Sequence, residues 1–85
     1  MQANSFDYMV DPDGPTPLYV QVADLIEGMI RDGTLPPNRP IPSEATIQQR
    51  YGVARGTTRK AVEVLRERGL VFTVHGKGTF VAPTA

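Results

Sequence analysis

The feature that most constrains this chain is the stretch 42–70, in which two helical patterns are separated by one glycine. Ser43 stands at an N-cap position, and Glu44 follows it in the first turn, where a carboxylate complements the helix dipole. Gly52 supplies the backbone freedom that ends the first helix. Apolar side chains recur at helical spacing on both sides of this turn: Ile47 and Tyr51 before it, Val53 at the corner, and Thr58, Ala61, Val62 and Leu65 after it.

The second helical pattern, which starts at Ala54, carries basic residues on a face of its own. Arg55 and Arg59 lie four residues apart, away from the apolar positions, and Lys60 and Arg66 are nearby. A short helix, a glycine turn and a second helix with a basic outer face describe a helix-turn-helix. In that motif the second helix enters the major groove of DNA.

Charged residues on a helix usually form only a solvated face, so the interpretation that these residues contact DNA must be weighed against that simpler explanation. Three features favour contact with DNA. Arg55 and Arg59 stand at the helix start, the end that meets base edges in this motif. The short residues Ala54, Gly56 and Thr57 would let the backbone approach a duplex, and no acidic residue lies between positions 52 and 62.

The distribution of charge supports the same reading, although the formal net charge is zero. Residues 1–32 hold six acidic side chains and one basic side chain, a net charge of −5. Residues 33–85 hold eight basic and three acidic side chains, a net charge of +5. We therefore expect a dipolar molecule with one basic face, as nucleic-acid binding requires.

The length of 85 residues predicts one small domain with a modest core. The chain has no cysteine, which excludes disulfides and thiolate metal sites and fits a cytoplasmic location. The first ten residues lack the basic and apolar segments of a secretion signal, and we expect no membrane span.

The segment before the helix-turn-helix is expected to contain an acidic tail and one more helix. Residues 1–15 show turn-forming steps and no periodicity, so they predict a flexible acidic tail. A helix should run from about Pro17 to Asp32, with Thr16 as its N-cap and Pro17 at its first position. Its apolar stripe, which we expect in the core, consists of Leu18, Val22, Leu25, Ile26, Met29 and Ile30.

Residues 33–42 contain four prolines and can form neither a helix nor a central strand. We expect an extended linker that lays Leu35 and Ile41 against the core. Asn38, after Pro37, is a candidate for the left-handed conformation.

The end of the chain changes to strand composition after Gly69, which should cap the preceding helix. Two β-rich runs surround a glycine-bearing turn formed by His75, Gly76, Lys77 and Gly78, and this pattern predicts a hairpin. The flanking apolar residues are expected to pack the hairpin onto the helices: Val71, Phe72, Val74, Phe80 and Val81.

The hairpin tip does not predict catalysis or a cofactor site. The run from Gly76 to Thr79 lacks the spacing of a phosphate-binding loop and precedes a strand instead of a helix. His75 is the only histidine, and without cysteines or a carboxylate cluster it makes no metal site. We therefore expect no enzyme, no metal and no cofactor. Beside a basic helix, a narrow tip with His75 and Lys77 suits the minor groove or its phosphates.

Several motifs together resemble the N-terminal domain of GntR-family bacterial transcription regulators, with the opening and the hairpin most similar to the HutC branch. The resemblance covers about residues 16–82. It is carried by Pro17-Leu18-Tyr19 with Gln21, Pro42-Ser43-Glu44, Gly52-Val53 before Arg55, Arg59 with Ala61 and Leu65, Gly69-Leu70-Val71, and Gly76 with Gly78-Thr79-Phe80-Val81.

The resemblance implies an α+β, mainly α fold: a winged helix-turn-helix of three helices and a C-terminal β-hairpin wing. The domain would occupy residues 16–84, with the helix-turn-helix at about 44–63 and the wing at about 70–82, and without an effector-binding domain in this chain. A small-molecule effector is then expected only if a C-terminal domain exists elsewhere.

The resemblance also implies a transcription regulator, acting as a repressor, that binds double-stranded operator DNA as a homodimer on a palindromic site. The third helix would read the major groove and the wing the minor groove. The positions expected to contact DNA are Ser43, Arg55, Gly56, Thr57, Arg59, Lys60, His75, Gly76 and Lys77.

Among the departures of this chain from the family pattern, two remove polar groups. Ala54 stands where the family usually has Ser or Thr, so a helix cap worth about 1 kcal/mol is lost. Ala45 removes another polar contact.

The alternative function is a protein-interaction module that uses the acidic side of the first helix or the tail. Inward-facing arginines at 55 and 59, or arginines locked to carboxylates of the same molecule, would contradict the regulator interpretation.

Overall fold

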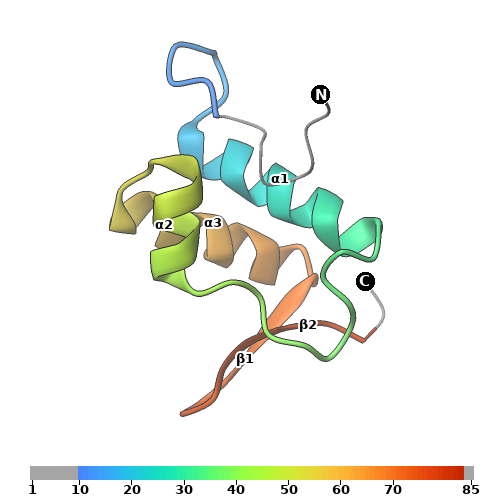
Figure 1. Cartoon of the computed structure of the whole chain (residues 1–85). Helices are drawn as coiled ribbons and strands as arrows, with labels where there is room; N and C mark the ends of the chain where they lie inside the picture. Colours follow the sequence, from blue (N-terminus) through green and yellow to red (C-terminus); the bar gives the residue numbers. More distant parts are fainter. Residues whose placement is uncertain (1–9, 84–85) are drawn as a thin grey trace.

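The computed structural model describes residues 10–83, which form three helices followed by a two-stranded antiparallel hairpin (Figure 1). The winged helix-turn-helix expected from the sequence is confirmed. Within the described residues, no helix has the length and apolar character needed to cross a bilayer. The elements in chain order are α1 (Leu18–Arg31), α2 (Glu44–Tyr51), α3 (Arg55–Glu67), β1 (Val71–Val74) and β2 (Gly78–Val81).

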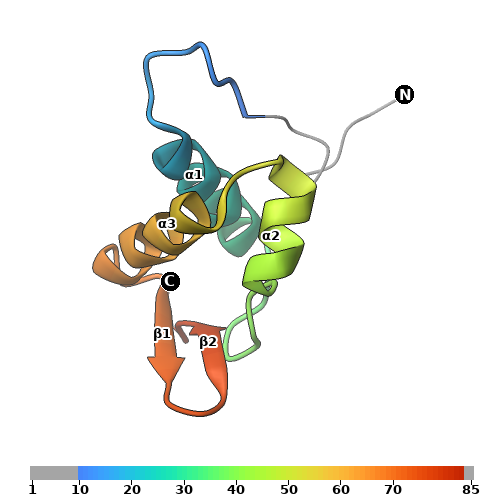
Figure 2. The ribbon, with the colours of Figure 1, turned by 90° about the vertical axis from the view of Figure 1, so that its left-hand side faces the viewer.

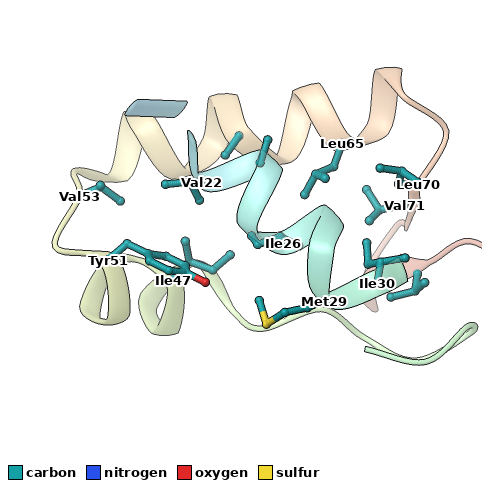
Figure 3. Packing of buried hydrophobic residues seen from close by; sticks show 13 residues of the cluster. Val22, Ile26, Met29, Ile30, Ile47, Tyr51, Val53, Leu65, Leu70 and Val71 are labelled. Atoms are coloured by element: carbon teal, nitrogen blue, oxygen red, sulfur yellow. The ribbon is translucent and has the colours of Figure 1, made fainter. Parts of the chain in front are cut away.

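The core lies mainly where α1 packs against α3, with α2 and the base of the hairpin closing its ends (Figure 3). Ile26 of α1 and Leu65 of α3 are fully buried in it. The expected stripe of α1 is confirmed, with Leu18 and Leu25 at its partly buried edge. The corner residue Val53 is also buried, as expected.

The start of α1 differs from the expectation. The helix begins at Leu18, Pro17 occupies the N-cap position, and no side chain caps it. The Pro17 carbonyl accepts from the amides of Val20 and Gln21 at 3.0 and 3.1 Å, so this carbonyl starts the helix. Thr16 is therefore not the N-cap, and its carbonyl accepts from Gln21 Nε2 at 2.7 Å.

Gln21 also orders the segment that precedes α1. Its Oε1 accepts from the Asp11 amide at 2.7 Å, and its Nε2 donates to the Asp11 carbonyl at 2.9 Å. Val10 packs against the core, and a turn closes between Asp11 and Gly14. One flexible tail was expected over residues 1–15. These contacts hold residues 10–15 beside α1, while the rest of that tail lies outside the described residues.

The short helix α2 has the caps that its sequence predicts. Ser43 Oγ accepts from the Thr46 amide at 3.1 Å, and Glu44 lies in the first turn. Gly52 ends the helix in the left-handed conformation with a φ of 65°, where a side chain would cause strain. The turn into α3 is therefore fixed by its one glycine.

The helix α3 starts without a side-chain cap, because Ala54 occupies the N-cap position. Thr58 is fully buried, and its hydroxyl donates to the Ala54 carbonyl at 3.2 Å. This bond satisfies the hydroxyl but leaves the first amides of α3 without a side-chain acceptor. The loss of the cap inferred from the sequence is thus a property of the structure.

The linker before α2 runs along the outer edge of β2. The Asn38 amide donates to the Val81 carbonyl at 2.9 Å, and the Ile41 amide donates to the Thr79 carbonyl at 3.0 Å. Asn38 has a φ of 63°, which confirms the left-handed conformation expected there. Leu35 and Ile41 pack against the core, as expected. This edge pairing fixes the wing relative to α2.

The wing projects away from the three helices in both views (Figures 1 and 2). Val71 and Val81 are paired and buried, but Phe72 is 37% exposed. Its ring stacks on that of Phe80, with centroids 5.8 Å apart. The expectation that the flanking residues pack onto the helices is therefore confirmed for Val71 and Val81 but wrong for Phe72, Val74 and Phe80, which lie on the other face of the hairpin. Alternate residues of a strand point to opposite faces, so Phe72 cannot share the face of Val71.

Replacing Ala54 by Ser should raise the free energy of unfolding by about 1 kcal/mol, since a hydroxyl would accept from an amide in the first turn of α3. Urea unfolding followed by circular dichroism measures this change. Ala45→Ser is the control, because Ala45 is equally exposed but lies inside α2. Ala45→Ser should not raise the free energy of unfolding. An equal effect of both variants would contradict the capping argument.

Candidate nucleic-acid interface

Arg55 and Arg59 point away from the core, on the side of α3 opposite α1. Their side chains are 68% and 58% exposed. The condition that would have contradicted the regulator interpretation, an inward orientation, is therefore not met. The buried stripe of α3 covers only part of the helix surface, and the charged residues occupy the rest, with Arg55 and Arg59 on one flank of the stripe.

Among residues 10–83, one carboxylate forms an ion pair with both arginines, and it comes from a different helix. Glu44 of α2 has its Oε1 3.9 Å from Arg55 Nε and 3.8 Å from Arg59 Nε. At these separations, between exposed groups, the interaction is weak. The structure shows no hydrogen bond for either pair within residues 10–83. The arginines are thus held near a shared carboxylate without being locked to it.

An open groove lies between α3, the end of the linker and the wing, with a volume of about 580 Å³. Three of the expected contact residues line it together: Ser43, Arg59 and Lys77. Arg66, which was not among the contact positions expected from the sequence, lines the same groove. A helix turns by about 100° per residue, so Arg66 returns to within about 20° of the direction of Arg55. That spacing was the signal that could have identified it.

Lys60 occupies a different place from the arginines. Its Nζ lies 5.0 Å from the centroid of the Tyr19 ring, a cation–π contact with α1. It lines a small hollow of about 160 Å³ that also contains Glu63 and Glu67. Lys60 therefore does not join Arg55 and Arg59 on one surface.

The remaining expected residues lie at the two ends of the interface. Gly56 and Thr57 are in the first turn of α3, and a Cβ on Gly56 would meet nothing within 4 Å. At the wing tip, the Lys77 amide donates to the Val74 carbonyl at 2.9 Å and closes the turn. Gly76 has a φ of 79°, so this turn depends on its glycine. His75 is exposed at the same tip.

Other basic residues belong to an ion-pair network that joins α1 to the C-terminal end of α3. Arg68 Nη1 lies 2.9 Å from Asp24 Oδ1 and 2.6 Å from Glu27 Oε1, and Arg31 Nε lies 2.8 Å from Glu27 Oε2. Asp24, followed by Glu27, raises the pKa of Arg68. The hydrogen bond from Arg31, with that from Arg68, lowers the pKa of Glu27 below its usual 4.5. These ion pairs neutralise carboxylates that do not line the groove.

The match with known proteins now decides the family. Residues 18–81 match the model of the family described as "Bacterial regulatory proteins, gntR family". The chain belongs to the GntR family. These residues include all three helices and both strands of the fold.

Curated GntR relatives resemble this chain over most of its length. The HTH-type transcriptional repressor NagR of Bacillus subtilis (strain 168) is 34% identical over 73 residues, which are 86% of this chain and 30% of the relative. The histidine utilization repressor of Pseudomonas putida is 39% identical over 70 residues, 82% of this chain and 28% of the relative. This similarity agrees with the HutC-like branch expected from the sequence. The chain spans less than a third of the length of these relatives.

A solved structure shares the arrangement of the elements as well. AraR(DBD) in complex with operator ORX1 superposes with a TM-score of 0.80 at 39% identity, covering 88% of this chain and 95% of that one. The winged helix-turn-helix described above is thus the fold of a known GntR-type domain.

The ion-pair network gives a prediction about pH. A carboxylate with a lowered pKa stabilises the fold above its unfolded pKa and loses that contribution as the pH falls through the folded pKa. The parent should therefore exceed Glu27→Gln by about 1 kcal/mol in free energy of unfolding near pH 7, and this excess should shrink below pH 4.5. Chemical unfolding at a series of pH values measures it.

The control for this prediction is Glu67→Gln, which removes a carboxylate that forms no ion pair with a residue in 10–83. The free energy of unfolding of Glu67→Gln should stay close to that of the parent at every pH. If the parent remained more stable than Glu27→Gln by the same free energy down to pH 3, the carboxylate charge would not be the source of the stabilisation.

Proposed function

We propose that this chain binds double-stranded DNA as the DNA-binding domain of a transcription regulator that acts as a repressor. The observation that carries this proposal is the outward arginine side of α3 beside a glycine-tipped hairpin, both bordering one groove. The similarity to AraR(DBD) in complex with an operator supports it. So do the repressors among the relatives.

In this proposal α3 enters the major groove and its first turn reads base edges. Arg55 and Arg59 are exposed, long and one helical turn apart, so their guanidinium groups can reach neighbouring base pairs. Paired hydrogen bonds from arginine to guanine O6 and N7 are the commonest specific contact, and we expect guanine in each half-site. Gly56 and Thr57 bring the backbone close to the duplex.

The wing tip supplies contacts that do not depend on base sequence. His75, Gly76 and Lys77 form a narrow exposed turn, which fits the adjacent minor groove or its phosphates. Ser43, which precedes α2, lines the same groove as Lys77. Its hydroxyl accepts from the Thr46 amide and donates to Thr46 Oγ1, so the phosphate contact that we assign to Ser43 requires its O–H to turn from Thr46 to the phosphate.

A single copy of this domain makes few contacts and should bind weakly. We therefore propose that two copies bind a palindromic operator, with half-sites separated by about one turn of DNA or a multiple of it. This function places the protein in the cytoplasm. An effector ligand enters the proposal only through a further domain, and no residue of 10–83 is assigned to one.

Selection of binding sites from random duplexes, followed by a salt titration of the selected sequence, tests this function. We expect one palindromic sequence to be enriched, and the logarithm of the binding constant to fall linearly with the logarithm of salt concentration. Failure to enrich any sequence, or binding that does not respond to salt, would contradict the proposal. The latter result would favour a protein-interaction module.

Replacing Arg55 by Ala should weaken binding to the selected site by roughly 1–3 kcal/mol and relax the preference at one base pair of each half-site. Lys77→Ala is the contrasting variant. It should weaken binding to all duplexes alike and make the slope of the log–log salt plot shallower by about 1. Fluorescence anisotropy with selected and scrambled duplexes measures both. Parent-like binding by both variants would show that the roles are wrongly assigned.

Replacing Glu44 by Gln should raise the affinity for any duplex by about two- to fivefold at low salt, because it removes a carboxylate that attracts both arginines. Anisotropy with a random duplex measures the change. Glu67→Gln is the control, since its carboxylate lies on the other side of α3, by Lys60. Weaker binding by Glu44→Gln would mean that the carboxylate orients the arginines productively.

A further inference from the structure

Arg66 is connected to the wing by a short chain of hydroxyl groups. Its Nη2 donates to Thr73 Oγ1 at 3.0 Å, and Thr73 Oγ1 lies 3.2 Å from Thr79 Oγ1. Thr73 and Thr79 are directly paired across the hairpin. The face that they share is the one toward α3, whereas the stacked rings of Phe72 and Phe80 occupy the opposite face. The wing is thus joined to α3 by a polar contact near the groove.

The charges around this contact favour an anion in the groove. Arg59, Arg66 and Lys77 line it with three positive charges, against the carboxylates of Glu44 and Glu63. The hydroxyls of Ser43, Thr73 and Thr79 line it too. Cations and hydroxyls of this kind are the usual donors to DNA phosphates.

Arg66 is suited to hold such an anion because one hydrogen bond uses only part of its guanidinium group. An arginine has five N–H donors, and Thr73 takes one from Nη2. The side chain is exposed, so the remaining donors are accessible. A guanidinium already held in place loses less conformational freedom when it binds.

We propose that Arg66 is a phosphate-binding residue, oriented by Thr73, that grips the DNA backbone strand running between α3 and the wing. This inference rests on the proposed function and adds to it a contact without base specificity. Thr73 is a positioning residue, since it acts through the guanidinium that it holds.

The experiment measures binding of the 85-residue chain to a selected duplex and to a random duplex over a range of salt concentrations. Arg66→Ala should weaken binding to both duplexes roughly tenfold, since a hydrogen bond to a charged group is lost. The negative slope of the log–log salt plot should become shallower by about 0.9, the value for one phosphate contact. Arg66→Lys should keep the parental slope because it keeps the charge.

Arg31→Ala is the matched control, because it removes the same charge from α1, where Arg31 pairs with Glu27 and does not line the groove. It should leave the slope unchanged. Thr73→Val keeps the shape and the charge but removes the hydroxyl, so the slope should persist while the affinity falls a few-fold. Thermal unfolding of each variant verifies that the compared proteins are folded, and Arg66→Lys and Thr73→Val test the inference if Arg66→Ala does not fold.

A slope for Arg66→Ala equal to that of the parent would overturn the phosphate contact and leave Arg66 a structural link to the wing. Parental affinity in Thr73→Val would overturn the positioning role. Both results require that the parent binds DNA in a salt-dependent way. Absence of such binding in the parent would instead contradict the proposed function itself, so the two failures are distinguishable.

Discussion

The packing of α3 against α1 is the interaction on which the rest of this structure depends. Ile26 and Leu65 are fully buried between the two helices, and Ala61 is small enough for close approach. Once this side of α3 is covered, the arginines at 55 and 59 remain on the exposed surface of the helix. Burial of apolar area therefore both stabilises the domain and sets the direction of its charged side chains.

Charge is divided between two surfaces with different roles. On the α1 side, Arg68 and Arg31 are paired with carboxylates at hydrogen-bonding distances, which neutralises much of the acidic charge of the first helix. On the groove side, Glu44 is the carboxylate nearest the arginines and lies at the outer limit of an ion pair. A zero net charge is thus compatible with a basic interface, because pairing removes charge selectively.

The position of the wing is set by contacts on both of its strands. The linker pairs with β2 through Asn38 and Ile41, and Arg66 of α3 donates to Thr73 of β1. A two-stranded hairpin alone is marginally stable in water, so these supports matter for its position. The groove between α3 and the wing is consequently bordered by elements that are each fixed to the helices.

The sequence by itself determined the elements of this protein: the short-range signals of Ser43, Gly52 and the apolar spacing were sufficient, because caps, turns and periodicity act within a few residues. Only the tertiary structure decided which charges meet. Glu44 approaches Arg59 from another helix, Lys60 turns to Tyr19, and Arg66 reaches the wing. Sequence spacing could not predict these contacts, since they depend on how separate elements pack. Likewise, α1 starts at the Pro17 carbonyl without the expected Thr16 cap, and the Gln21 side chain binds the backbone of Asp11, ten residues away.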